Sequence, residues 1–143
     1  MNGAALWEAG YRNLYGFDMS ETSLKVAREK RVYSHLFLGT IGPETSLDYE
    51  TGYFDLVFST GCFIPNHLNE SHIPEMIRLV KKGGYLVIVT RKIEFEREEG
   101  DLKLKSSLRK MVEDGILKKI SHEDVTYKID KNMPGITLCY RVN

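Results

Sequence analysis

Hydrophobic and polar positions along the 143-residue chain follow two different patterns. Short runs of consecutive apolar residues, typical of strands buried on both faces, occupy residues 14–17, 36–38, 53–59 and 85–89. Elsewhere apolar residues recur at helical spacing, most clearly over residues 71–81 and 104–112. Buried strands that alternate with helices predict an α/β domain built on a largely parallel sheet.

The ends of these elements carry recognisable signals. Residues 4–10 predict a short helix that ends at Gly10, and Ser20 is a suitable cap for a helix over residues 21–30. The glycine pair at residues 83–84 is expected to end the helix over residues 71–81. The last part of the chain predicts a strand from residue 117 to 122, extending toward 128. Over residues 136–142 apolar and polar side chains alternate with a period of two, which predicts an antiparallel closing strand.

Length and composition favour one cytoplasmic domain over residues 1–143 that binds a small molecule. The 20 basic and 20 acidic residues give no net charge, which argues against nucleic acid or an anionic membrane as the main partner. Cys62 and Cys139 are far apart and indicate neither a disulfide framework nor a zinc cluster. No apolar run approaches the ~20 residues needed to span a bilayer. The mixed charges of residues 92–105 predict a solvated loop and helix face.

Candidate binding residues follow the predicted strands, because ligands of open parallel sheets bind beyond the carboxyl ends of the strands. Asp18 ends the first predicted strand, where a carboxylate can accept two hydrogen bonds from the hydroxyls of a ribose. The alternative is that Asp18 caps the helix that begins after Ser20. Ser59, Thr60 and Gly61 end a later strand, where a glycine allows backbone to approach a ligand. An ordinary turn explains these three residues equally well.

Other polar residues give weaker signals. Thr40 and Ile41 follow the second predicted strand, where they could border a purine ring. His67 and His72 are five residues apart, which is not the spacing of a helical metal pair, so no metal site is predicted and a structural histidine is favoured at both positions. Cys62 has no identifiable activating base, which favours a buried thiol over a nucleophile.

Three stretches of the sequence resemble the class I S-adenosylmethionine-dependent methyltransferases, and among them the methyltransferase-like proteins of the Williams-Beuren chromosomal region. They are residues 10–20 (GYRNLYGFDMS), 53–63 (YFDLVFSTGCF) and 76–89 (MIRLVKKGGYLVIV). Together with the terminal strand they cover most of the chain. The resemblance implies a Rossmann-like, doubly wound sheet with an antiparallel C-terminal strand, and S-adenosylmethionine as the cofactor.

The resemblance also implies roles for individual residues. Asp18 would bind the cofactor ribose, Met19 would lie along the adenine, and residues 59–61 would form the rim of the pocket. His67 would lie in the loop on the substrate side. These enzymes begin with a strand and a GxGxG-type loop, of which Gly3 could match only the last small residue, so the chain is expected to be an N-terminally truncated member. No catalytic side chain is assigned.

The expected reaction is transfer of a methyl group to an oxygen, nitrogen or sulfur of a small acceptor molecule. Without the first strand, its two expected neighbours would pair directly, recruit a strand from another copy through exposed sheet edges, or leave backbone groups unpaired. A homodimer formed through such edges is therefore one expectation. Two other functions stay open: a catalytically inactive α/β binding module, and a nicotinamide-dependent oxidoreductase, in which an acid also binds a ribose.

Overall fold

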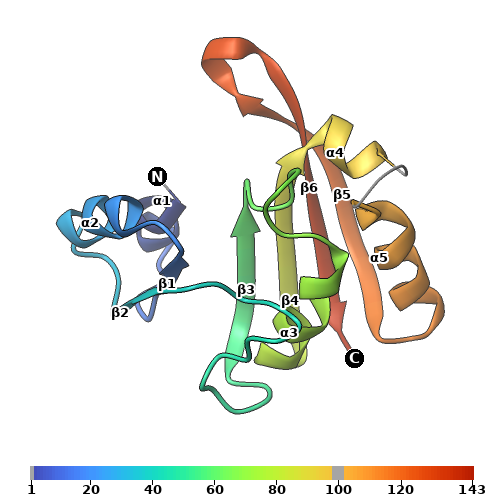
Figure 1. The fold of residues 1–143 in the computed structure, drawn as a ribbon, viewed down its shortest axis with the longest axis horizontal. Coiled ribbons are helices and arrows are strands. Elements are labelled where there is room, and N and C mark those ends of the chain that lie inside the picture. Colours follow the sequence, from blue (N-terminus) through green and yellow to red (C-terminus); the bar gives the residue numbers. More distant parts are fainter. Residues whose placement is uncertain (1, 98–101) are drawn as a thin grey trace. The chain divides into compact units, whose positions relative to one another are not determined.

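A computed structural model describes residues 2–97 and 102–143 of the chain (Figure 1). The chain divides into two compact units, which are unit 1, residues 1–41, and unit 2, residues 42–143. Each unit contains its own sheet, with two strands in the first and four in the second. A single domain over residues 1–143 stays a prediction, and the units are described one at a time.

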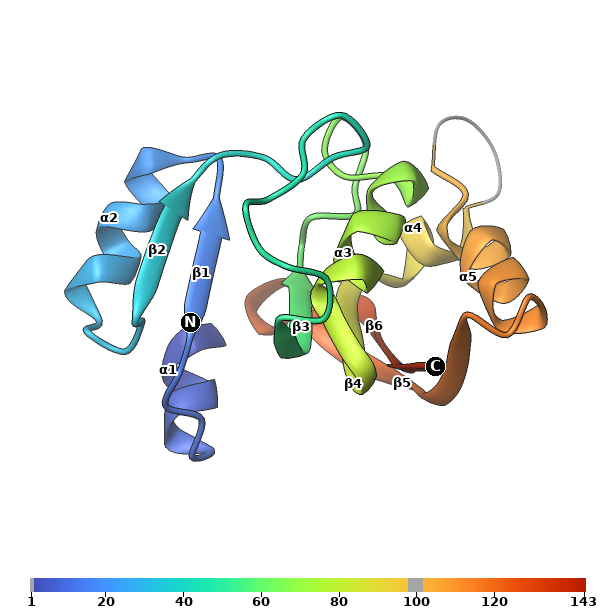
Figure 2. The ribbon, with the colours of Figure 1, turned by 90° about the horizontal axis from the view of Figure 1, so that it is seen from below.

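Unit 1 consists of a leading helix followed by one strand–helix–strand unit. Its elements are α1 (Asn2–Glu8), β1 (Tyr15–Asp18), α2 (Glu21–Glu29) and β2 (His35–Leu38). Gly10 adopts a φ of 101° after α1, and the Ser20 side chain accepts a hydrogen bond of 3.2 Å from the Ser23 backbone N–H, as the sequence predicts. Strands β1 and β2 are parallel, and α2 packs against both (Figure 2).

Unit 2 is a four-stranded mixed sheet with helices packed on it. The strands, in the spatial order β3-β4-β6-β5, are β3 (Phe54–Thr60), β4 (Val80–Arg91), β6 (Met133–Val142) and β5 (Leu117–Lys128). The helices are α3 (Ile73–Leu79), α4 (Lys92–Glu96), α5 (Leu104–Glu113) and two 3-10 turns, Glu70–His72 and Ile129–Lys131. Strand β3 is parallel to β4, whereas β6 is antiparallel to β4 and to β5. The predicted antiparallel closing strand is therefore confirmed.

The strands on either side of the predicted missing strand are β1 and β3. They belong to separate sheets, so direct pairing between them, one of the three alternatives above, is not found among residues 2–97 and 102–143. Recruitment of a strand from another copy stays a prediction.

The core of unit 2 lies between the sheet and its helices. Ile136, Leu138, Tyr140 and Val142 are buried at alternate positions of β6, which confirms the predicted period of two. Leu104 and Leu108 of α5 are completely buried, at the helical spacing that the sequence shows. Burial of such a side chain contributes about 1.5–3 kcal/mol to stability.

The glycine pair at residues 83–84 does not end a helix, so that prediction is wrong. Helix α3 ends at Leu79, and the chain enters β4 at Val80, which pairs with Phe54 of β3. Gly84 is instead required by a close backbone approach, because a Cβ at this position would lie 2.7 Å from the Asp55 carbonyl oxygen. The β3–β4 register is irregular at this point.

The charged segment after β4 also departs from the predicted solvated face. Glu94 of α4 is only 2% exposed, because it turns inward beside buried Phe95 and forms ion pairs with two arginines. Arg91 Nη2 donates to Glu94 Oε1 at 2.5 Å, and Arg97 Nε lies 3.4 Å from Oε2. Residues 98–101 of the segment lie outside the described residues.

The hairpin formed by β5 and β6 extends beyond the upper ends of β3 and β4 in Figure 1. Both of its strands are long, and they stay paired from Leu117–Val142 to Lys128–Met133. Within the described ranges 2–97 and 102–143, no helix is long and apolar enough to cross a membrane.

Candidate functional site

The predicted site residues of unit 1 gather at one edge of its sheet. Because β1 and β2 are parallel and Asp18 pairs with Leu38, their carboxyl ends lie together. The Gly39 N–H donates to the Asp18 carbonyl oxygen at 3.1 Å and ties the segment that leads to Thr40 to the end of β1. Asp18, Met19 and Thr40 are thus brought to the same edge.

Asp18 combines parts of both roles considered for it. Its Oδ1 accepts a hydrogen bond of 2.8 Å from the Ser20 backbone N–H, so this oxygen fixes the turn before α2. The side chain is solvent-exposed, and Oδ2 has no hydrogen-bond partner among the described residues. One carboxylate oxygen is therefore available to accept a hydrogen bond from a ligand hydroxyl, while the other holds the group in position.

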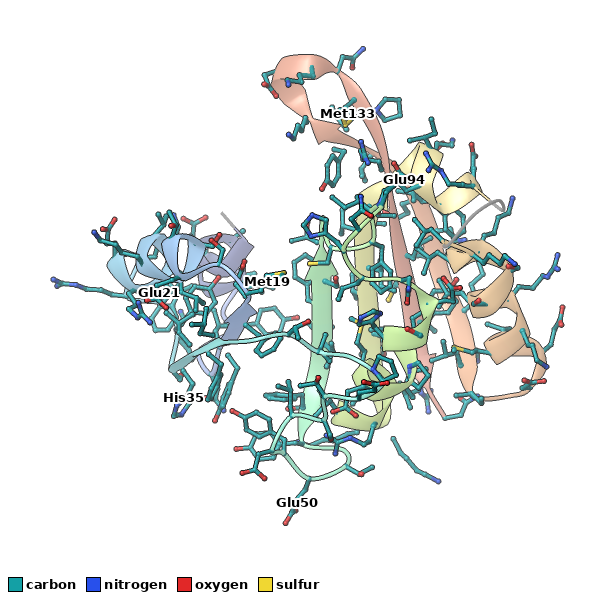
Figure 3. The ribbon with its side chains drawn as sticks, viewed as in Figure 1. Met19, Glu21, His35, Glu50, Glu94 and Met133 are labelled. Atoms are coloured by element: carbon teal, nitrogen blue, oxygen red, sulfur yellow. The ribbon has the colours of Figure 1, made fainter. Side chains whose placement is uncertain are left out.

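The exposed apolar surface at this edge includes Met19 and Leu38 but not Ile41. Met19 projects from the end of β1 with 69% of its surface exposed (Figure 3), whereas Ile41 is buried. The Thr40 hydroxyl donates to the Ile41 carbonyl oxygen at 3.3 Å. A flexible thioether side chain adapts well to a flat aromatic ring. The geometry is therefore compatible with Met19 beside a purine. The cofactor contacts of Asp18, Met19, Thr40 and Ile41 stay predictions.

In unit 2, the rim predicted at residues 59–61 lies at the carboxyl end of β3. The Gly61 N–H donates to the Val89 carbonyl oxygen at 2.9 Å, and its φ of 71° turns the chain out of the sheet. Ser59 is 7% exposed, and its buried hydroxyl has no hydrogen-bond partner in the described part of the chain. A buried polar group without a partner costs about 1–3 kcal/mol.

The loop after Gly61 is anchored to the core. The Thr90 hydroxyl donates to the Phe63 carbonyl oxygen at 2.8 Å, and the Phe63 ring is completely buried. The Leu68 N–H donates to the Cys62 carbonyl oxygen at 2.9 Å and closes the loop. His67 is exposed on this loop, and its role on the substrate side stays a prediction.

The two other side chains considered for chemistry have structural contacts. His72 Nδ1 accepts a hydrogen bond of 3.2 Å from the Asn69 N–H, which forms a capping box at the start of the 3-10 turn. The Cys62 thiol donates to the Thr60 carbonyl oxygen at 3.4 Å. In the part of the chain that the structure describes, no group of three or more histidine, cysteine or acidic side chains could hold a metal ion.

Two hollows lie away from the residues that the sequence singles out. One, of about 300 Å³, lies at the amino end of β2 and so at the opposite end of that strand from Thr40; it is lined by Ala27, Arg28, Arg31, Tyr33, Ser34, His35 and Leu36. The other, of about 870 Å³, lies beside α4 and the start of β6, and it is lined by Arg91, Lys92, Ile93, Glu96, Arg97, Met133 and Pro134. No motif marks either hollow, because each is assembled from residues of ordinary surface type.

Comparison with known proteins identifies the fold. The family model described as "Methyltransferase domain" matches residues 2–88. Among curated proteins, no sequence matches the chain. Several solved structures are similar. The PH0226 protein of Pyrococcus horikoshii has a TM-score of 0.70 and 16% identity, over 99% of this chain and 76% of its own.

Two further structures carry more specific descriptions. An S-adenosylmethionine dependent methyltransferase from Mesorhizobium loti has a TM-score of 0.69 and 12% identity, over 96% of this chain and 85% of its own. The N-methyltransferase NodS of Bradyrhizobium japonicum, solved with S-adenosyl-L-homocysteine, has a TM-score of 0.62 and 17% identity, over 91% of this chain and 66% of its own. At these identities the similarity shows a shared fold. It confirms the predicted fold class, a Rossmann-like sheet of the class I methyltransferase type.

Proposed function

Because this chain belongs to the methyltransferase domain family, whose cofactor is S-adenosylmethionine, we propose that it binds S-adenosylmethionine and transfers its methyl group to a small acceptor molecule. The observation that carries the proposal is the end of β1. There, Asp18 keeps one carboxylate oxygen unpaired among the described residues while the Ser20 N–H holds the other. A carboxylate fixed in this way is suited to bind the hydroxyls of a ribose.

The chain's own residues need to supply position more than proton transfer. Bound S-adenosylmethionine would supply a methyl group already activated as a sulfonium, so the main task left to the protein is to hold donor and acceptor in line. In this proposal Asp18 orients the ribose and Met19 covers one face of the adenine. This division explains why no conventional acid or base is required at the site.

The sheet topology supports this proposal over a nicotinamide-dependent oxidoreductase. A dinucleotide-binding sheet of the Rossmann type is mostly parallel, whereas β6 here is antiparallel both to β4 and to β5. The inactive binding module shares the topology, and it is separated from the methyltransferase only by ligand binding and turnover.

The test is calorimetric titration of the intact chain with S-adenosylhomocysteine, the product form of the cofactor. We expect micromolar binding, and silence up to millimolar ligand would refute the proposal. Asp18→Asn is the informative variant, since the amide oxygen can still accept from Ser20 while the charge is lost. Loss of a charged hydrogen bond costs about 1.5–3 kcal/mol, so affinity should fall about 10- to 150-fold. Unchanged affinity would remove Asp18 from the site.

Activity is then tested separately from binding. The chain is incubated with methyl-labelled S-adenosylmethionine and a panel of small phenols, amines and thiols, and labelled product is counted. Transfer to any member supports the enzyme, whereas cofactor binding without transfer to any of these acceptors supports the inactive module.

A further inference from the structure

The larger of the two hollows lies where β4 ends. Arg91 is the last residue of β4, α4 follows it directly, and Met133 begins the neighbouring strand β6. Because β3 and β4 are parallel, the hollow lies beyond the carboxyl end of a parallel strand, where ligands of open α/β sheets bind. Its volume of about 870 Å³ is within the range of small-molecule sites. All of its lining residues belong to unit 2.

Two arginines on the wall of this hollow are held by one buried carboxylate. Arg91 Nη2 donates to Glu94 Oε1 at 2.5 Å, and Arg97 Nε lies 3.4 Å from Oε2 of the same side chain. Each guanidinium uses one nitrogen in this arrangement, and within residues 2–97 and 102–143 neither side chain has another hydrogen bond or ion pair. Both arginines are partly exposed, so their remaining N–H groups are left for water or a ligand.

The positive charge of the hollow is concentrated at these two arginines. A single carboxylate serves both guanidinium groups, which leaves one positive charge in excess. The third cation of the wall, Lys92, has acidic neighbours of its own. Its Nζ donates to Asp124 Oδ2 at 2.5 Å, and this hydrogen bond, together with the charges of Asp124 and Glu96, raises the pKa of Lys92. An anion in the hollow is therefore favoured beside the arginines.

The rest of the wall includes an exposed apolar surface. Ile93, in the first turn of α4, has 64% of its surface exposed, and Met133 and Pro134 contribute from the start of β6. The flexible thioether of Met133 adapts to flat or branched groups. An apolar surface with a few convergent polar groups is typical of sites that bind small organic molecules.

We propose that this hollow binds a small organic carboxylate with an apolar body. Arg91 and Arg97 bind the carboxylate, and Ile93 and Met133 contact the body. A guanidinium can donate two parallel hydrogen bonds to a carboxylate, which a neutral group does not match in strength. Glu94 is a positioning residue, because it orders both arginines before the ligand binds and so lowers the entropic cost of binding. Unit 2 forms this site alone, independently of the proposed function.

The test compares phenylbutyrate with its neutral amide, phenylbutyramide, and with inorganic phosphate. Each is titrated to about 10 mM into the isotopically labelled intact chain, and backbone amide shifts are followed by NMR spectroscopy. Phenylbutyrate should shift the amides of residues 91–97 and Met133. Phenylbutyramide should bind about tenfold more weakly, because it lacks the charge. Phosphate should also bind more weakly, because it lacks the apolar body.

Two variants separate the charge from the apolar contact. Arg97→Gln should weaken phenylbutyrate binding about tenfold and leave phenylbutyramide binding unchanged. Ile93→Ser should weaken both ligands about threefold, because only apolar contact is lost. Arg109→Gln is the matched control and should bind like the unmodified chain, since Arg109 lies in an exposed pair with Glu113 of α5. The circular dichroism spectrum of each variant verifies that it is folded.

Several results would overturn the proposal. They are the absence of shifts at residues 91–97 up to about 10 mM phenylbutyrate, equal affinity for the acid and its amide, and equal affinity for phosphate and phenylbutyrate. Phenylbutyrate binding that is the same in Arg97→Gln and Arg109→Gln would also overturn it. The comparison of the acid with its amide needs no variant, so it decides the matter even if Arg97→Gln does not fold.

Discussion

Replacing Tyr140 by phenylalanine removes one hydroxyl from a contact between β5 and β6. Tyr140 is 2% exposed, and its hydroxyl lies 2.7 Å from Nε2 of His122. The two rings are also in edge contact, with centroids 5.4 Å apart. Burial, together with the charge of Lys119, holds the pKa of His122 below its usual value, so above neutral pH the imidazole is uncharged. The contribution of His122 to the free energy of unfolding is therefore constant over the alkaline range.

The magnitude follows from two opposing effects of the hydroxyl. At pH 7 its hydrogen bond stabilises the fold by about 1 kcal/mol, which Tyr140→Phe would lose. Burial raises the pKa of Tyr140 from 10.0 to about 12. A pKa raised on folding means that the unfolded chain releases its proton first as pH rises, so this contribution is present below pH 10 and is lost above it. The loss amounts to about 1.4 kcal/mol at pH 11.

The stability difference between the two proteins should consequently reverse. Urea unfolding followed by circular dichroism is measured for the unmodified chain and Tyr140→Phe at pH 7, 9 and 11. The unmodified chain should be more stable by about 1 kcal/mol at pH 7 and equal to or less stable than the variant at pH 11. All other titrating groups are shared and cancel. A difference that stays constant from pH 7 to pH 11 would refute the assignment of a buried, hard-to-ionise phenol.

Two further substitutions test the packing around the rim and α4 in the same urea assay. Gly61→Ala should destabilise the chain by about 2–3 kcal/mol, because both the positive φ and the nearby Tyr127 hydroxyl oppose a side chain at this position. Gly115 is the control, since it has a similar φ of 75° but no neighbouring atom in the way. Gly115→Ala should therefore cost only about 1 kcal/mol. An equal loss of stability in Gly61→Ala and Gly115→Ala would show that Tyr127 does not limit the space beside Gly61. Glu94→Gln should cost about 1–3 kcal/mol by removing a buried charge from its arginines, whereas Glu113→Gln, in an exposed pair, should cost under about 0.5 kcal/mol.

Local sequence signals were sufficient for the features that depend on neighbouring residues. The apolar run that contains Leu86 and Ile88 predicted a buried strand, and both residues are completely buried in β4. The Ser20 cap and the turn at Gly61 were also predictable, because a hydroxyl before a helix and a glycine after a strand act within a few residues. The gathering of Asp18 and Thr40 followed from the parallel pairing of two adjacent strands.

Features that depend on distant residues could not be predicted. The burial of Glu94 depends on how α4 packs after β4, and its charge pattern resembles that of an exposed helix. The pair Gly83–Gly84 has the composition of a helix end, yet Gly84 is needed where β3 passes close to β4. Tyr127 meets Gly61 across 66 positions of sequence through a bulge, and no short motif specifies such a contact.

The division of the strands into two sheets has a consequence for cooperativity. A ladder of two strands, each four residues long, holds few hydrogen bonds and is marginal on its own. Its amide protons should therefore exchange with solvent through local opening, before those of the four-stranded sheet. A nucleoside bound by Asp18 would favour the state in which β1 and β2 are paired. The measured affinity of the nucleoside would then include the free energy of ordering residues 15–38, and binding would be visible as slower amide exchange in this segment.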